Sequence, residues 1–213
     1  NTQRFERQAK YIEQSSQLLV LSPRLAKDAR EAVQGEPTAF KNLKESRDRF
    51  DAIVTVLKNG DPVRNVAPTP SEVMPSLDAV IRLWAPSSNE GLRAQVDQIL
   101  TQQEPLFAMR NHVLAINQIA PQLLAKSDEI VALGSQAGMK QEDLFIVNRQ
   151  GMLSQRIAKD VNLFAQGGNE AAVAAAQFGK DARLYRDSQA KLRLGIPSEA
   201  RPKLNESVAI FAQ

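Results

Sequence analysis

The chain has 213 residues, of which 43% are hydrophobic and 24% charged, values that are ordinary for a globular protein. Its net charge of +3 gives no argument for nucleic-acid binding, and the absence of cysteine excludes disulfides and thiolate chemistry. Only 5% of the residues are aromatic, whereas Ala, Leu, Gln, Lys, Arg and Glu are plentiful, a mixture that favours helix over sheet. The chain has no phosphate-binding glycine loop, nucleophile elbow or metal-ligand spacing, so we expect no enzyme, no cofactor and no metal site.

The first predicted helix runs from about residue 3 to Val33. Apolar and small residues recur along it in steps of three and four, a heptad seam typical of helices packed nearly parallel: Ile12, Ser15, Leu19, Ser22, Ala26, Ala29 and Val33. Gly35 is a C-cap candidate, and Pro37 suits the first turn of the next helix. This second helix covers residues 37–58, and its apolar face comprises Phe40, Leu43, Phe50, Ile53, Val54 and Leu57.

A break at residues 59–62 leads into a loop rich in Pro and Asn, and a short helix follows from Ser71 to Trp84, interrupted or started late at Pro75. From residue 90 to about 137 the pattern stays helical, with kinks expected at its two prolines, Pro105 and Pro121. A helix of about 45 residues would be roughly 70 Å long. That length is too great for one compact bundle, so we expect this helix to be shared by two bundles.

Three further helices are predicted after Gly138, over residues 141–165, 169–193 and 198 to the end. The helix over 141–165 has its own seam, formed by Leu144, Val147, Gly151, Ser154, Ala158, Val161 and Ala165. No run of alternating apolar and polar residues indicates a strand. The expected fold class is therefore all-α, with two stacked helical bundles sharing a long central helix.

A motif occurs twice, 132 residues apart. Residues 21–28 read Leu-Ser-Pro-Arg-Leu-Ala-Lys-Asp, and residues 153–160 read Leu-Ser-Gln-Arg-Ile-Ala-Lys-Asp, so six of the eight positions are identical. An internal repeat of this kind predicts two related modules, which we place at residues 1–110 and 111–213. The first module lacks a fourth helix, and we expect the continuation of the last helix beyond Gln213 to supply it.

The second copy of the motif carries a basic face on its predicted helix. Arg149, Met152, Arg156 and Lys159 follow one another at i, i+3, i+7 and i+10, and Arg24 and Lys27 occupy the matching positions of the first copy. Cations at this spacing predict a site for an anion or for carboxylates of a partner protein. The alternative is a solvated basic face without a ligand. Four small residues of the motif are expected to pack against a neighbouring helix: Ser22, Gly151, Ser154 and Ala158.

The stretch Met-Leu-Ser-Gln-Arg-Ile-Ala at residues 152–158 resembles the characteristic box of the PilJ-type sensor domain family. That family includes type IV pilus methyl-accepting chemotaxis transducers and, more distantly, nitrate/nitrite sensor kinases. The resemblance implies a periplasmic ligand-sensing domain of a bacterial inner-membrane transducer that controls twitching motility and surface signalling. It further implies a homodimer, an unknown small ligand, a membrane-proximal module at 1–110 and a membrane-distal one at 111–213. A cytoplasmic histidine kinase and an adaptor would be reached through a separate signalling region.

Two other functions stay open. One is a structural module that docks a pilin subunit or another protein and binds no small molecule. The other is an anion sensor of the nitrate/nitrite type. In the nitrate-sensing relatives a basic residue immediately precedes the Met of the box, whereas this chain has Gly151 there and Leu19 in the first copy. Neither residue has a side-chain donor or a charge with which to bind nitrate, so the sequence favours docking over nitrate sensing.

Overall fold

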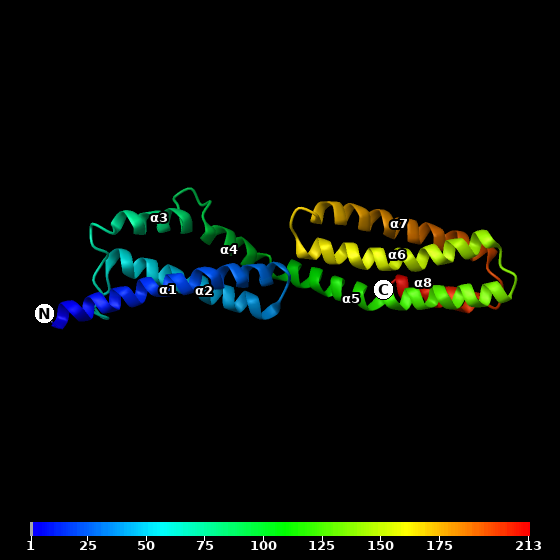
Figure 1. Cartoon of the computed structure of the whole chain (residues 1–213), viewed down its shortest axis with the longest axis horizontal. Coiled ribbons are helices and arrows are strands. Elements are labelled where there is room, and N and C mark those ends of the chain that lie inside the picture. Colours follow the sequence, from blue (N-terminus) through cyan, green and yellow to red (C-terminus); the bar gives the residue numbers. More distant parts are fainter. Residues whose placement is uncertain (1) are drawn as a thin grey trace. The chain divides into compact units, whose positions relative to one another are not determined.

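The computed structural model describes residues 2–213, and its regular structure over that range is all-α, which confirms the expected fold class (Figure 1). Apart from an isolated bridge between Asp61 and Val66, the described residues contain no β-structure. None of the described helices is both long and apolar enough to cross a membrane. The helices are α1 (Thr2–Val33), α2 (Pro37–Asn59), α3 (Met74–Trp84), α4 (Leu92–Thr101), α5 (Gln103–Gln136), α6 (Gln141–Gln166), α7 (Ala171–Gly195) and α8 (Arg201–Phe211).

The helices form two compact units, each with its own core. The first unit extends to Ala108 and holds α1 to α4, and the second comprises Met109–Gln213 and holds α6 to α8. The boundary falls inside α5, most of which belongs to the second unit. Each copy of the repeated motif therefore lies in its own unit.

The first unit is built on the hairpin of α1 and α2. The turn between them uses Gly35 at φ 77°, a left-handed conformation that glycine adopts without steric cost. The backbone N–H of Glu36 donates to the carbonyl of Glu31 at 3.0 Å, and this bond closes the end of α1. The apolar face predicted for the second helix is present in α2, where Phe40, Leu43, Phe50, Ile53 and Leu57 are buried.

Trp84 anchors the last turn of α3 to α2. Its side chain is buried, and its ring lies 4.2 Å from that of Phe50, measured between ring centroids. The indole N–H donates to the carboxylate of Asp51 at 2.7 Å, and Arg93 of α4 donates to the same carboxylate at 2.7 Å. One acid of α2 thus holds both α3 and α4. The helix α3 begins late, at Met74 with Pro75 in its first turn, as predicted.

The seam predicted for the first helix is wrong by one position. The fully buried residues of α1 are Leu21, Leu25, Asp28 and Ala32, a row that precedes the predicted seam by one residue throughout. On the predicted seam, Ile12 is 54% exposed and Leu19 is 77% exposed. Both rows have heptad spacing and both carry apolar residues, so periodicity alone did not distinguish the row that α2 and α4 cover from its neighbour.

The long helix predicted from residue 90 to residue 137 is two helices, α4 and α5, separated at Gln102. Pro105 explains the break, because a proline ring inside a continuous helix collides with the carbonyl four residues earlier. That carbonyl belongs to Thr101, the last residue of α4. In α5, Pro105 stands at the third position, where its missing N–H would have no helical partner in any case. Pro121, by contrast, lies inside α5.

The second unit is a bundle of α5, α6, α7 and α8. One cluster of buried residues joins all four helices: Ile130, Met139, Leu144, Val147, Leu192, Ile196, Ala200 and Leu204. A second cluster comprises Leu123, Leu153, Ile157 and Tyr185, and the ring of Tyr185 stacks on Phe211 of α8 at 4.3 Å between centroids. Burial raises the pKa of the Tyr185 hydroxyl, which lies 3.2 Å from the Ser207 hydroxyl.

Four charged side chains link α5 to α8 at the surface of this bundle. Lys126 lies 3.1 Å from Glu129 and 2.9 Å from Glu206, and Lys203 lies 3.2 Å from Glu129 and 3.3 Å from Glu206. Hydrogen bonds from the two ammonium groups lower the pKa values of both Glu129 and Glu206, and the bonds to Glu206 and Glu129 raise the pKa of Lys126. The four groups form a closed ring of alternating charge.

Candidate functional site: the repeated motif on α1 and α6

The motif helix α6 is buried on two adjacent rows rather than one. The predicted seam is largely covered, with Leu144, Val147, Gly151, Ser154 and Val161 buried. The row one position earlier is covered as well, and it includes the buried residues Gln150, Leu153, Ile157 and Asp160. Leu153 and Ile157 match Leu21 and Leu25 of α1 at the offset of 132, so both copies share one buried row and differ in the other.

The small residues of the second copy lie in close helix packing. A Cβ atom on Gly151 would come within 3.0 Å of Leu124 Cδ1 and 3.3 Å of Ser127 Cβ, both on α5. The buried hydroxyl of Ser154 donates to the Gly151 carbonyl at 2.7 Å, and Ala158 is half-buried. A longer side chain at position 151 would therefore press against Leu124 and Ser127, so this position faces the packed helix α5 and not an open site for a cation.

The prediction that Ser22 packs against a neighbouring helix is wrong. Ser22 is exposed, and its hydroxyl donates to the carbonyl of Leu18 within α1 at 2.9 Å. Its equivalent, Ser154, is buried because α5 covers that side of α6. No described helix covers the corresponding side of α1, which is the row that contains Ser22 and Leu19.

The basic face of the second copy is exposed at Met152 and Lys159 and is anchored at its two arginines. The guanidinium carbon of Arg149 lies 6.0 Å from the ring centroid of Phe145, one turn earlier on α6, and the Arg149 Nε atom is buried without a hydrogen-bond partner among the described residues. Met152 is 67% exposed and Phe145 is 65% exposed. Basic and large apolar groups thus alternate along one side of α6.

Arg156 forms an ion pair that the pattern of the motif does not predict. Its guanidinium donates to Asp181 of α7 at 3.1 Å, with the second carboxylate oxygen at 3.0 Å, and Gln177 donates to the same carboxylate at 2.9 Å. Asp181 is 1% exposed, whereas the Arg156 side chain is 53% exposed. One side of this guanidinium neutralises a buried acid, and the other side remains open to solvent.

The cations of the first copy are paired within their own helix. Arg24 Nε lies 3.7 Å from Asp28, and Lys27 lies 3.7 Å from Glu31. Asp28 is buried, as is its equivalent Asp160 in the second copy, and in each an Oδ2 atom has no hydrogen bond from the described residues. The repeat itself indicates that these two acids are equivalent, because both eight-residue copies of the motif end in Asp. Asp181 lies outside the motif, and nothing in the spacing of the motif indicated it.

A mainly apolar cavity of about 370 Å³ lies on the opposite side of the second motif, where Ser154 and Ile157 contribute to its wall. Its apolar lining includes Ile116, Ile119, Leu123, Phe178 and Phe211. This side of α6 offers space for an apolar group, and neither lysine nor arginine lines the cavity. No cluster of three or more metal-ligating side chains is found among residues 2–213.

Comparison with known proteins finds one matching family and two similar proteins. Residues 1–115 match the family described as "Type IV pili methyl-accepting chemotaxis transducer N-term". The chain is 31% identical over 210 residues to Protein PilJ of Pseudomonas aeruginosa, which covers 94% of this chain and 30% of that protein. It is 27% identical over 177 residues to the "Putative methyl-accepting chemotaxis AlkN" of Alcanivorax borkumensis, covering 82% of this chain and 24% of that protein.

The chain thus spans less than a third of the length of the two relatives. The family match lies over the first copy of the motif, and the fuller form of the box lies in the second copy, beyond the matched residues. The helical hairpins, the repeated motif and the match over more than half of the chain lead to one assignment. The chain belongs to the family of type IV pilus methyl-accepting chemotaxis transducer N-terminal domains.

Proposed function

We propose that this chain is the periplasmic ligand-sensing domain of a methyl-accepting chemotaxis-type transducer that controls type IV pilus twitching motility and surface signalling. The observation that carries the proposal is the box of the PilJ-type family, present once in each of two helical units of a chain that belongs to this family. The family description and the name of the Alcanivorax relative both refer to methyl-accepting chemotaxis, which supports a signalling role rather than a catalytic one.

In this proposal the first unit is membrane-proximal and the second membrane-distal, with the module boundary near residue 110. The rest of the transducer would supply the membrane anchor and a cytoplasmic signalling region that acts on a histidine kinase and an adaptor. The length of the relatives supports this division, because this chain covers only 30% of Protein PilJ of Pseudomonas aeruginosa. The sensing domain would act as a homodimer, as is usual for symmetric receptors.

The dimer surface that we propose is the uncovered row of α1. Leu19 is 77% exposed and Ile12 is 54% exposed, and Val33 extends the same row to the end of the helix. The equivalent row of α6, which contains Gly151 and Ser154, is covered by α5. The same row of the motif thus has a helix packed on it in the second unit. A second copy of α1 would give the first unit the same arrangement. The alternative occupant of this row is the fourth helix of the first module, which the sequence predicts as a continuation of the last helix.

A second candidate function, docking of a pilin subunit, is favoured by the composition of the α6 face. Phe145 and Met152 are more exposed than most large apolar residues, and Lys159 lies on the same side of the helix. Aromatic, Met and basic side chains in one patch are typical of protein interfaces. Nitrate sensing is the weaker alternative, because the structure packs Gly151 against α5 where a cation would be needed.

Labelling of one introduced thiol tests the proposed location. The chain has no cysteine, so Lys159→Cys in the full-length transducer adds a thiol at an exposed position of this domain. A membrane-impermeant maleimide added to intact cells should label this variant, since the periplasm is open to small reagents. Labelling that occurs only after the cells are lysed would contradict a periplasmic domain.

A further inference from the structure

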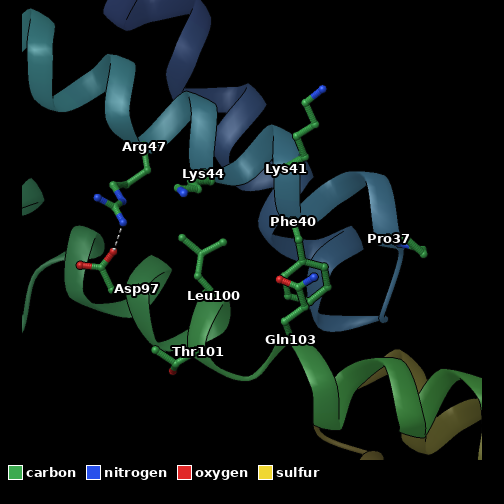
Figure 2. A pocket seen from close by; sticks show the side chains of 9 residues that line it. All are labelled: Pro37, Phe40, Lys41, Lys44, Arg47, Asp97, Leu100, Thr101 and Gln103. Carbon is green, nitrogen blue, oxygen red and sulfur yellow. Dashed lines mark ion pairs between the residues drawn. The ribbon is translucent and has the colours of Figure 1, made fainter.

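A hollow in the first unit lies apart from both motif copies and has a basic wall. It has a volume of about 620 Å³ and lies between α2, α4 and the beginning of α5 (Figure 2). The α2 side contributes Lys41, Lys44 and Arg47, which lie at i, i+3 and i+6 on that helix. The opposite side contributes one acid, Asp97, together with Leu100, Thr101 and Gln103.

The three cations differ in how far their charge is already used. Arg47 lies 3.0 Å from Asp48 and 3.0 Å from Asp97, so its guanidinium is held by two acids. Lys41 is 4.0 Å from Glu45, and both of these side chains are largely exposed. Lys44 has no ion pair or hydrogen bond within the part of the chain that the structure describes. Lys44 is therefore the cation of this wall that is free to bind an added anion.

Figure 2 shows how these side chains lie. Lys44 and Arg47 lie on the side of α2 that faces Asp97 and Leu100, whereas Lys41 extends away from them. Arg47 is anchored in place by Asp97, and its Nε atom is buried without a hydrogen-bond partner among the described residues. A buried donor without an acceptor is uncommon in proteins and indicates a site that a ligand or water completes.

The remaining lining supplies one neutral donor, one acceptor and apolar surface. The Thr101 hydroxyl already donates to the Gln98 carbonyl at 2.8 Å, so its oxygen is available as an acceptor, while the Gln103 amide can donate. Phe40 and Leu100 form apolar wall beneath the cations, and the Phe40 ring is fixed by an edge contact with Phe107 at 5.1 Å between centroids. A ligand that matches this lining has an anionic group and an apolar body.

We propose that this hollow is a binding site for a small organic carboxylate, with Lys44 as the residue that binds the carboxylate group. Arg47, held by Asp48 and Asp97, forms the wall beside Lys44, and Leu100 contacts the apolar body. Glu45, Asp48 and Asp97 pair with Lys41 and Arg47, which leaves Lys44 as the cation of the lining that an added anion can pair with. The site is independent of the basic face on α6 and does not require the signalling role proposed above.

Calorimetric titration of the 213-residue domain with benzoate at low ionic strength tests the proposal, with inorganic phosphate as the anion that lacks an apolar body. We expect saturable binding of benzoate that weakens with added salt, and weaker binding of phosphate. Lys44→Gln should weaken benzoate binding about tenfold or more, because it removes a charge-assisted bond. The matched control is Lys58→Gln, on the same helix, exposed and outside the hollow.

Backbone amide shifts locate the bound probe independently of affinity. We expect benzoate to shift the amide resonances of Leu100, Thr101 and Gln103, and these shifts to disappear in the Lys44→Gln variant. Absence of saturable benzoate binding by the wild-type domain would overturn the proposal. Equal weakening by Lys44→Gln and Lys58→Gln would also overturn it, since that result would show a general charge effect and no site.

Discussion

At the scale of single residues, the two copies of the motif have kept the same identities in different surroundings. Leu21 and Leu153 are buried at equivalent positions, whereas Ser22 is exposed and Ser154 is buried. The difference comes from the neighbouring helices and not from the motif, because α5 packs closely on α6 at Gly151. Identity of sequence therefore predicted the register of the repeat and did not predict which positions are covered.

Gly151 and Gly179 provide a matched pair of helix-interior glycines. An alanine Cβ at Gly179 meets no atom within 4 Å, so Gly179→Ala should stabilise the domain by about 0.5–1 kcal/mol through helix propensity. The same change at Gly151 brings Cβ to 3.0 Å from Leu124 Cδ1, and that contact should cancel or reverse the gain. Urea unfolding of the two variants measures the difference. Equal stabilisation by both would show that α6 and α5 are not closely packed at Gly151.

Arg156 has a structural role in addition to the binding role suggested by the sequence. Arg156→Ala leaves the buried Asp181 with Gln177 as its remaining side-chain donor, and we expect a loss of about 1–3 kcal/mol in unfolding free energy. Lys159→Ala, which removes an exposed cation of the same face, should change stability by less than about 0.5 kcal/mol. Adding Asp181→Asn to Arg156→Ala should restore part of the loss. If Arg156→Ala unfolds like the wild type, the ion pair does not stabilise the domain.

At the scale of helices, most boundaries followed from local signals in the sequence. Gly35 ends the first hairpin turn, and Pro75 marks the late start of α3, both as predicted. Pro105 predicts a kink near this position, and the structure has a complete break between α4 and α5 there. The choice of buried row in α1 could not be made from the sequence, because two adjacent rows have the same period and similar apolar content. The partner of Arg156 also lies 25 residues away on another helix, and no periodicity links the two.

The charged ring between α5 and α8 makes this contact sensitive to acid. The folded-state pKa values of Glu129 and Glu206 are lowered, so these groups stabilise the fold above the ordinary carboxylate pKa of 4.5. Their contribution is lost as the pH falls below 4.5 through the lowered values. The variant Glu129→Gln/Glu206→Gln should therefore be less stable than the wild type at pH 7 and should approach it at the acidic end.

Thermal unfolding of both proteins from pH 7 to pH 3, at low and high salt, measures this effect. High salt should reduce the difference at pH 7, because all four groups are at least partly open to solvent and are therefore screened. A difference between variant and wild type that does not depend on pH would mean that the two glutamates act through packing and not through their charge.

At the scale of the whole molecule, two units share one motif and present different surfaces. The first unit has an uncovered apolar row on α1 and a basic hollow at α2, and the second has an exposed basic and apolar face on α6. A transducer domain needs a surface for its own partner subunit and a surface for its signal. The proposal assigns the α1 row to the partner subunit and leaves the α6 face for the signal or for a docked protein.

The proposed dimer predicts a site-specific cross-link. Leu19→Cys places the only thiol of the chain on the uncovered row of α1, and mild oxidation should convert much of the domain to a covalent dimer. Glu13→Cys lies on the same helix, is exposed and points away from that row, so it should cross-link far less. Equal cross-linking of both variants, or of neither, would contradict a dimer formed through this row.

Twitching motility tests the central claim most directly. The substitution Arg149→Gln/Lys159→Gln changes the signal face of α6 and spares the Arg156–Asp181 pair, and Lys180→Gln on α7 serves as its control. Introduced into the full-length transducer at its native locus, the double variant should change the diameter of the twitching zone while the protein remains present at its normal level. The control should twitch like the wild type. Unchanged twitching both in the double variant and in a strain that lacks the whole transducer would contradict the proposed function.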